Sequence, residues 1–346
     1  MRTAPYSPVA VIAGGSAGVG RATLDLLIDR GWRVAVLARG QARLEEIERT
    51  HGDAVWTKSV DVADGAALTR AAGEIAEALG TPEIWVNSAM LTSFSPFDDV
   101  GEDEFRKITE TTYLGTVNGC RAALSVMHRG NIVNVGSGLA YTSVPNQAAY
   151  CGAKHAVEGF TQSLRIELAR SARPITLSMV QLPAINTPQF DWARNRMDKH
   201  PQPAPPIFQP EVAARAVLRA IDTDAREILV GRSVLKLMAG NMMFPQTVES
   251  QLTQMGVEVQ KSDRPAEHDK DNLDSPAAYP ASAHGSFDTR AEDDGVIVDG
   301  DTARKTLIFG GAAALIVAGV LLGRMTRSTD RSLAAPYYDR PREYLS

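Results

Sequence analysis

Tyr150 and Lys154 are the residues whose types and spacing most directly suggest chemistry in this 346-residue chain. They lie four positions apart in a proline-free run with helical spacing, so both side chains leave the same face of one helix. An unperturbed phenol has a pKa of about 10, and an ammonium group beside it favours the phenolate. The pair therefore predicts a tyrosine that exchanges a proton with a substrate. The alternative is a packed ring beside a solvated lysine.

Two further motifs give this pair its context. Ser137 ends the apolar run 131–137, which reads as a strand, and ligands of open α/β sheets bind at the carboxyl ends of the strands. Near the N-terminus, the apolar run 9–13 leads into a glycine-rich turn at 14–20 and then a helix from about 21 to 30. Glycines let the backbone approach a pyrophosphate, and the helix N-terminus supplies N–H groups. The alternative for this motif alone is an ordinary tight turn.

Together these motifs resemble the short-chain dehydrogenase/reductase family over residues 7–235. The resemblance implies a Rossmann-like, doubly wound α/β fold with a parallel sheet of about seven strands. It also implies that Tyr150 exchanges the proton, that Lys154 lowers the pKa of the tyrosine and holds the nicotinamide ribose, and that Ser137 polarises the substrate oxygen. Thr112 stands where many relatives have an asparagine that supports a water of the proton relay, so it completes the predicted catalytic set.

The resemblance also assigns residues to the cofactor. The glycine-rich turn resembles the family's Thr-Gly-x-x-x-Gly-x-Gly, except that Ala13 replaces the threonine. Asp61-Val62 resembles a pair that lies against the adenine ring, although Asp61 could instead cap a helix. Residues 87–90 resemble Asn-Asn-Ala-Gly, and residues 183–187 resemble the segment that contacts the nicotinamide carboxamide and phosphate. The predicted cofactor-binding residues are Gly14, Ser16, Gly18, Gly20, Arg39, Asp61, Val62, Asn87, Ala89, Tyr150, Lys154, Pro183, Ala184 and Thr187.

The end of the second predicted strand, residues 33–38, favours NADP(H) over NAD(H). Relatives that select NAD place an acid at this position, whereas this chain has Ala38. Arg39 follows directly, and Arg43 lies one helical turn further on. An arginine fork suits a 2′-phosphate, which a carboxylate would repel. The alternative is two solvated arginines at the start of a helix.

The rest of the chain is predicted to add a lid, an extension and a linker. The proline-rich residues 189–209 cannot form one regular helix and are predicted to lie as a lid over the substrate cleft. Residues 236–259 are expected to be a helical extension. Residues 260–304 are rich in Asp, Pro, Ser and Ala, which predicts a flexible acidic linker. His268 and His284 within it show no metal-ligand spacing, so no metal site is predicted.

The uncharged run 307–323 is bracketed by basic residues and predicts a transmembrane helix over 305–324, followed by a short tail at 325–346. At about 1.5 Å per residue this run reaches about 25 Å, the short limit for a spanning helix. The alternative is a buried core helix. Small residues recur along the run in a pattern that could pair two helices, which is compatible with a homo-oligomer.

The charge and the cysteine content restrict which classes of partner and which cell compartment we expect for this chain. The net charge of −5 and the lack of a basic run argue against binding to nucleic acid. Cys120 and Cys151 both fall in predicted helices, which favours a reducing compartment over a disulfide framework. The first residues lack an apolar signal, so we expect the catalytic domain on the cytosolic face. The arginines that follow residue 323 give a contrary hint through the positive-inside rule.

The sequence therefore predicts a membrane-anchored, NADP(H)-dependent oxidoreductase that interconverts a carbonyl and an alcohol, with an apolar small-molecule substrate. The alternative is a non-enzymatic NADP(H)-binding scaffold or redox sensor at the membrane. The departures from the family pattern at Ala13, Met90 and Thr112 keep this alternative open. The intact serine, tyrosine and lysine weigh against it.

Overall fold

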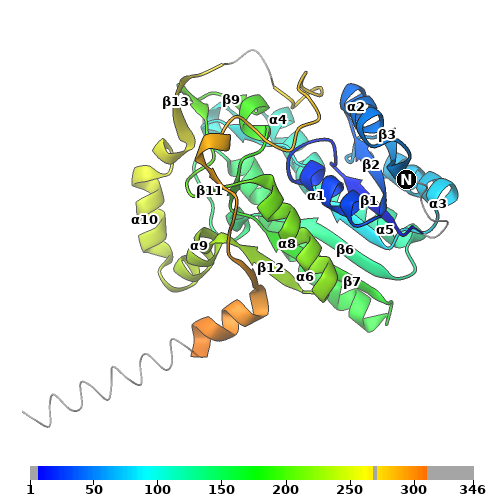
Figure 1. Ribbon diagram of the computed structural model, residues 1–346. Helices are drawn as coiled ribbons and strands as arrows, with labels where there is room; N and C mark the ends of the chain where they lie inside the picture. The colour runs from blue at the N-terminus through cyan, green and yellow to red at the C-terminus, as the bar shows by residue number, and fades with distance from the viewer. Residues whose placement is uncertain (1–6, 268–270, 310–346) are drawn as a thin grey trace, which may run out of the picture. The chain divides into compact units, whose positions relative to one another are not determined.

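Apolar runs form the strands, as expected for a parallel sheet that is covered on both faces. The computed structural model describes residues 7–267 and 271–309 and contains one eight-stranded sheet (Figure 1). In spatial order its strands are β15 (Ile297–Asp299), β12 (Glu227–Val230), β7 (Ile175–Gln181), β6 (Gly130–Val135), β4 (Ile84–Asn87), β1 (Val9–Ala13), β2 (Arg33–Ala38) and β3 (Val55–Ser59). All neighbours pair in parallel except β15, which is antiparallel to β12. The predicted Rossmann-like sheet is confirmed, and β15 is an edge strand that the apolar pattern does not reveal.

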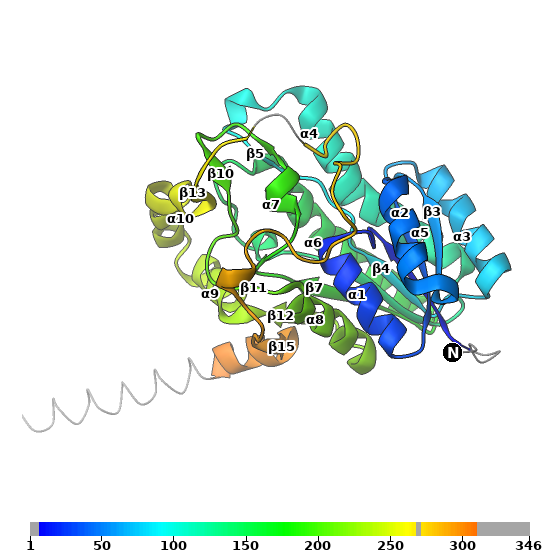
Figure 2. The ribbon, with the colours of Figure 1, turned by 45° about the horizontal axis from the view of Figure 1, so that its top comes forward.

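Helices bury both faces of this sheet. One apolar core lies under α1 (Gly18–Asp29), α2 (Gln41–His51) and α8 (Pro210–Thr223). The other lies under α3 (Gly65–Leu79), α5 (Gly115–Val126) and α6 (Ala148–Arg170). Helices α1 and α8 lie side by side in both ribbon views (Figures 1 and 2). Because both faces are dry, polar side chains can gather only at the ends of the strands.

Shorter elements follow the carboxyl ends of β4 and β7. They are β5 (Ser93–Phe94), β8 (Ala184–Ile185), α7 (Gln189–Trp192), β9 (Arg194–Asn195), β10 (Lys199–Pro201) and β11 (Ile207–Phe208). The predicted lid, residues 189–209, is therefore a chain of short pieces rather than one helix. Its strands pair with β5, β8, β13 (Lys261–Pro265) and β14 (Ala291–Glu292). Backbone hydrogen bonds thus hold the lid against the domain.

Three further helices are α4 (Glu102–Thr109), α9 (Gly231–Met243) and α10 (Pro245–Met255). Helix α4 continues through a π-helical turn, Glu110–Leu114, into α5. Such turns are rare and often occur at functional sites. Helices α9 and α10 form a contacting pair that occupies most of the predicted extension, residues 236–259.

The structure corrects the prediction of a flexible linker over residues 260–304. Strand β13 pairs with β10, and residues 271–300, which we call the strap, carry β14 and β15. The strap passes α7 and α1 before it reaches β15 (Figure 2). Leu273, Ala281 and Phe287 of the strap are buried. Composition misled the prediction because a few apolar anchors and many backbone hydrogen bonds hold this segment, and composition does not report backbone contacts.

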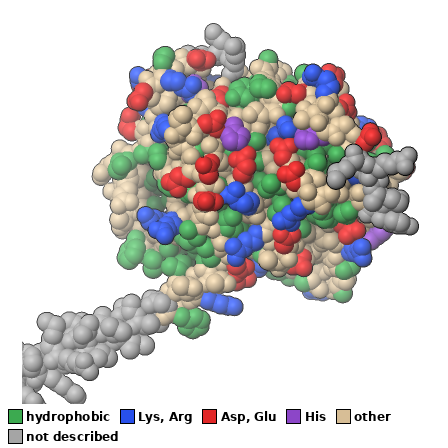
Figure 3. All heavy atoms as spheres, viewed as in Figure 1, with side chains coloured by type: hydrophobic (Ala, Val, Ile, Leu, Met, Phe, Trp, Pro, Cys, Tyr) green, Lys and Arg blue, Asp and Glu red, His purple; other side chains and the backbone are tan. Residues whose placement is uncertain are grey.

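Ion pairs fix the strap on its outer side as well. His284 lies between Asp288 (2.6 Å) and Glu211 of α8 (2.9 Å). Arg215 of α8 pairs with Asp294 at 3.2 Å. Figure 3 shows acidic, basic and histidine side chains interspersed over this face of the molecule. The strap is therefore docked through charge as well as through burial.

Contacts divide the chain after Gly300, and residues 301–309 are helical. The predicted transmembrane run 307–323 lies mainly outside the described residues, as does the tail 325–346, so both remain predictions. Among the residues that the structure describes, no helix combines the length and apolar character needed to cross a bilayer.

The edge strand leads to a prediction about truncation. A chain that ends after Arg290 loses β14 and its pairing with β11, and it loses β15 with its hydrogen bonds to β12 and the half-buried Ile297. At about 1 kcal/mol for each net hydrogen bond, we expect the Tm to fall by about 5 °C or more. A chain that ends after Gly300 keeps β15 and serves as the control, with an unchanged Tm in calorimetry. Equal Tm values for the two shortened chains would show that residues 291–300 do not stabilise the domain.

Candidate functional site

The carboxyl ends of the parallel strands open into a cavity of about 1460 Å³. Most of the predicted site residues line it, although they come from many separate elements. Those at its wall are Gly14, Ser16, Gly18, Arg39, Asp61, Val62, Ala89, Ser137, Tyr150, Lys154, Pro183, Ala184 and Thr187. Gly20, Asn87 and Thr112 are predicted site residues that the structure places behind this wall.

The glycine-rich turn is shaped by close backbone contacts. Gly14 has a φ of +93°, and a Cβ there would lie 2.4 Å from the Ala89 nitrogen. A Cβ on Gly20 would lie 2.1 Å from the Gly14 carbonyl oxygen, so Gly20 packs the turn instead of lining the cavity. Helix α1 starts here with no side-chain cap and no acidic residue in its first turn. This helix end fits the phosphates of a dinucleotide.

Ser137 stands directly after β6 and is held from two sides. Its backbone N–H donates to Gln181 Oε1 at 2.8 Å, and its Oγ accepts from the Leu139 N–H at 3.1 Å. Gln181 is fully buried and donates in turn to Glu158 at 2.7 Å. The sequence analysis missed Gln181, whose signal is a polar residue at the end of the apolar strand β7. Gln181 therefore positions the serine without facing the reacting atoms.

Tyr150 and Lys154 leave one face of α6, as predicted, but their mutual contact differs from the expectation. The Lys154 Nζ donates to the Val135 carbonyl at 2.8 Å and lies 5.6 Å from the centre of the Tyr150 ring. Burial lowers the pKa of Lys154 to about 8. Burial also raises the pKa of Tyr150, and a hydrogen bond to Ser137 opposes this only in part. The net shift of the Tyr150 pKa is therefore upward, because desolvation of the phenolate is the largest effect, and the lowering of this pKa by Lys154 stays a prediction.

Thr112 and Asn87 have structural contacts in place of the predicted site contacts. The fully buried Thr112 hydroxyl donates to the Leu91 carbonyl and accepts from the Leu91 N–H, both at 3.0 Å. It is thus not available to hold a relay water, and the neighbouring Thr111 lines the cavity instead. Asn87 accepts from Trp85 at 2.9 Å and donates to Asn134 at 2.8 Å inside the sheet. Its side chain ties β4 to β6.

Asp61, predicted to lie against the adenine ring, lines the cavity and also forms a local hydrogen bond. Asp61 Oδ1 accepts from the Ala63 N–H at 2.9 Å, whereas Asp64 caps α3. Asp61 therefore fixes a turn and is not the helix cap. Met90, which replaces the family glycine, also lines the cavity.

Arg39 and Arg43 lie together at this end and have no carboxylate hydrogen-bond partner among the contacts the structure describes. Arg39 donates to the carbonyls of Asn272 (2.5 Å) and Leu273 (3.3 Å), and Arg43 donates to the Ala277 carbonyl at 2.8 Å. Burial and the neighbouring Arg39 lower the pKa of Arg43. The Arg43 Nε is buried and has no hydrogen-bond partner in the described structure. Two adjacent cations, one of them desolvated, fit an anion such as a phosphate.

Other parts of the cavity wall carry apolar side chains. Phe190 and Phe208 line the cavity together with side chains from α9 and α10, and the α9 side chains include Arg232 and Lys236 as well as Leu237. Trp192 also lines the cavity, where the Arg43 guanidinium lies 5.0 Å from the centre of its ring. The α10 residues at the wall are Val248, Gln251, Leu252 and Met255. The sequence analysis missed them, although Val248, Leu252 and Met255 follow the helical spacing of one face. The apolar side chains at the wall suit a substrate with an apolar part.

The described residues hold no cluster of histidine, cysteine or carboxylate side chains that could bind a metal. Cys120 and Cys151 are both free and buried. Burial raises the pKa of the Cys120 thiol to about 12. Neither thiol is therefore suited to nucleophilic chemistry.

Comparison with known proteins gives consistent matches. The sequence pattern of the family described as short chain dehydrogenase matches residues 8–198, a range that contains Ser137, Tyr150 and Lys154. The uncharacterized oxidoreductase YxnA of Bacillus subtilis is 29% identical over 270 residues, which cover 75% of each chain. The 2-(R)-hydroxypropyl-CoM dehydrogenase of Xanthobacter autotrophicus is 32% identical over 230 residues, covering 64% of this chain and 88% of the relative.

Solved structures are similar over the same part of the fold. A short-chain dehydrogenase from Streptomyces avermitilis has a TM-score of 0.61 and 25% identity, covering 72% of this chain and 97% of its own. A short-chain dehydrogenase from Burkholderia cenocepacia J2315 in complex with NADP has a TM-score of 0.60 and 26% identity, covering 71% of this chain and 97% of its own.

The buried lysine leads to a prediction about pH and stability. A pKa that falls from 10.5 to about 8 on folding corresponds to roughly 3 kcal/mol of destabilisation. This cost is fully present below about pH 8 and disappears as the pH rises toward 10.5, because the unfolded state then also loses the proton. We therefore expect Lys154→Met to raise the Tm at pH 7 and to raise it less at pH 10.

The measurement is thermal unfolding of both proteins across this pH range. Lys58→Met is a matched control, because the Lys58 ammonium forms a surface ion pair with Glu74. A Lys154→Met protein that is less stable than the wild type at pH 7 would contradict the prediction.

Proposed function

Because the chain belongs to the short-chain dehydrogenase/reductase family, we propose that it is an NADP(H)-dependent oxidoreductase that interconverts an apolar carbonyl compound and its alcohol. One observation carries the proposal. Ser137, Tyr150 and Lys154 line the same cavity as the arginine pair and the glycine-rich turn. A proton donor, a phosphate site and apolar side chains thus share one cavity.

The roles of the residues follow from their positions. NADPH, when bound, supplies the hydride. Tyr150 donates its proton to the substrate oxygen, and the Ser137 hydroxyl donates a hydrogen bond to the same oxygen. With a pKa of about 8, Lys154 is charged at pH 7 and stabilises the phenolate that Tyr150 leaves. The high pKa of the resting phenol keeps its proton in place until the substrate oxygen develops negative charge.

Two lines of evidence support the choice of cofactor and substrate. The arginine pair lacks an anionic hydrogen-bond partner among the described contacts, and the similar Burkholderia structure is a complex with NADP. The Xanthobacter relative is named a dehydrogenase of a hydroxypropyl compound, and another relative is the cis-2,3-dihydrobiphenyl-2,3-diol dehydrogenase of Rhodococcus globerulus. The apolar side chains at the wall, among them Leu237, Val248 and Leu252, favour substrates with an apolar part.

Tyr150→Phe tests the proton donor. We expect turnover to fall at least a thousandfold, because the ring remains and only the transferable proton is lost, while NADPH affinity stays within about threefold. Rates with a panel of ketones and aldehydes and a fluorescence titration with NADPH measure the two effects. Tyr113→Phe is the matched control, since Tyr113 packs against Phe160 outside the cavity wall.

Two outcomes would oppose this assignment. Turnover retained by Tyr150→Phe would mean that another group donates the proton. A wild-type protein that binds NADPH but reduces no carbonyl of the panel would favour the scaffold alternative.

Arg39→Asp tests the cofactor preference. A carboxylate at this position repels a 2′-phosphate and can accept from a ribose hydroxyl, so the ratio of kcat/KM for NADPH over NADH should fall at least a hundredfold. Arg49→Asp is the control, because Arg49 is exposed on α2 and does not line the cavity. An unchanged ratio for Arg39→Asp would place the phosphate contact elsewhere, with Arg43 as the next residue to change.

We also propose that residues 307–323 anchor the chain in a membrane, with the catalytic domain on the cytosolic side. The run is uncharged, and its first described residues include the exposed Ile308 (62%) and Phe309 (71%). A chain ending after Gly300 should move from the membrane fraction to the supernatant. A C-terminal tag should resist protease added from the cytosolic side. A shortened chain that stays in the membrane fraction would refute the anchor. A tag that the protease cleaves would refute the orientation.

A further inference from the structure

Backbone carbonyls of the strap occupy the hydrogen-bond donors at the phosphate end of the cavity. The Gly18 N–H, at the start of α1, donates to the Ser282 carbonyl at 3.0 Å. Arg39 donates to two strap carbonyls and Arg43 to a third. Neutral oxygens of residues far along the chain therefore stand where the oxygens of cofactor phosphates would be expected.

Side chains of the strap reinforce this arrangement. Leu273 is only 1% exposed and belongs to a cluster with Leu91, Ile108 and Ala149, against which Tyr150 packs. The Asn272 N–H donates to the Trp192 carbonyl at 3.0 Å. The strap thus lies on the cofactor end and beside the predicted proton donor at the same time.

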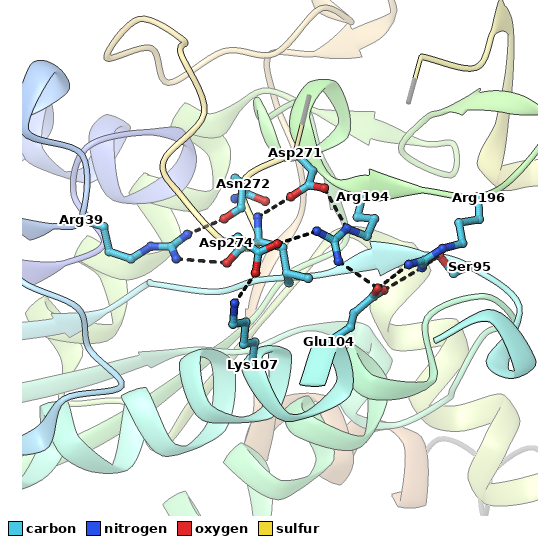
Figure 4. Close-up of polar contacts among 10 residues, drawn as sticks. Arg39, Ser95, Glu104, Lys107, Arg194, Arg196, Asp271, Asn272 and Asp274 are labelled. Carbon is cyan, nitrogen blue, oxygen red and sulfur yellow. Dashed lines mark hydrogen bonds and ion pairs between the residues drawn. The ribbon is translucent and has the colours of Figure 1, made fainter. Parts of the chain in front are cut away.

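An ion network anchors the start of the strap (Figure 4). Arg194 of β9 contacts Asp271 and Asp274, each at 2.8 Å, and Glu104 of α4 at 3.3 Å. Lys107 of α4 also pairs with Asp274. Glu104 is almost fully buried, so the network is partly protected from solvent screening. It joins the strap to the lid and to α4 without using either arginine of the phosphate site.

We propose that the docked strap is an autoinhibitory segment that competes with the 2′-phosphate of the cofactor for Arg39 and Arg43. This inference rests on the proposed NADP(H) dependence. The Asn272 and Leu273 carbonyls each accept from one terminal nitrogen of Arg39, so a phosphate can take that edge of the guanidinium only by displacing them. A phosphate brings a negative charge and bidentate geometry to the guanidinium, which a neutral carbonyl lacks, so the phosphate displaces the carbonyls.

Competition has a reciprocal consequence. The phosphate binds only to molecules in which the strap is released. The apparent association constant is therefore the intrinsic one multiplied by the fraction of molecules with a released strap. By linkage, a bound phosphate releases the strap to the same extent. The unpartnered Arg43 Nε shows that the strap satisfies the arginine pair incompletely, which favours exchange of the strap for the phosphate.

Hydrogen exchange of the full chain tests the release directly. The probe is adenosine 2′,5′-bisphosphate, which carries the 2′-phosphate without the nicotinamide, and adenosine 5′-monophosphate is the control. We expect amides of residues 272–282 to exchange at least fivefold faster with the bisphosphate and to change much less with the monophosphate. Exchange that slows or stays constant with bound bisphosphate would overturn the proposal. So would a failure of the bisphosphate to bind at millimolar concentration.

A double variant tests the same competition by affinity. Asp271→Asn with Asp274→Asn weakens the strap anchor and leaves the arginine pair intact, so bisphosphate should bind at least threefold tighter in calorimetry. Asp103→Asn with Asp222→Asn is the matched control, because each removes one surface ion pair away from the strap. Unchanged or weaker binding by the strap variant would overturn the proposal.

Neither experiment depends on turnover. Strap release in a protein that reduces no carbonyl would leave the autoinhibition standing while the proposed enzyme activity fails. NADPH-dependent turnover in a protein whose strap does not respond to the bisphosphate would support the proposed enzyme activity and overturn the autoinhibition.

Discussion

A parallel sheet that is buried on both faces confines polar chemistry to the ends of its strands. In this chain the two apolar cores leave the carboxyl edge as the place where separate loops meet. The glycine-rich turn follows β1, Ser137 follows β6, and Pro183 follows β7. Their approach in space is thus a consequence of topology, and it would be lost if any of these strands changed register.

The same geometry forces charged groups into poorly solvated surroundings. Lys154 is 4% exposed and has one carbonyl as its hydrogen-bond partner, and Arg43 is 9% exposed with an unpartnered Nε. Each carries a lowered pKa because burial penalises its charge. Desolvated cations of this kind interact strongly with any negative charge that enters the site.

The sequence predicted the parts of this arrangement that depend on local pattern. Apolar runs gave the parallel strands, and helical spacing placed Tyr150 and Lys154 on one face of α6. The predictions from the sequence were wrong where backbone hydrogen bonds or contacts between distant segments determine the structure. The strap was missed because its docking depends on carbonyls and a few buried side chains, such as Leu273, within a polar composition.

Among the site residues too, the sequence predicted those that follow a local pattern and not those whose role depends on distant contacts. Thr112 stands at the position of a family asparagine and was predicted to take its role, yet its hydroxyl bonds with the Leu91 backbone, a contact that no spacing rule reports. Gln181 escaped notice because a single glutamine at a strand end has no distinctive spacing, although its contact with Ser137 is direct. The sequence therefore reports which chemistry is present, whereas the three-dimensional contacts decide which groups are free to perform it.

Transfer of deuterium tests the central claim most directly. NADPH deuterated at C4 of the nicotinamide ring is incubated with the wild-type protein and a panel of carbonyl compounds with increasing apolar size, and the products are examined by mass spectrometry. The account predicts an alcohol that carries one deuterium on the former carbonyl carbon, with larger yields for the more apolar compounds. A protein that binds NADPH but forms no labelled alcohol from any compound would contradict it.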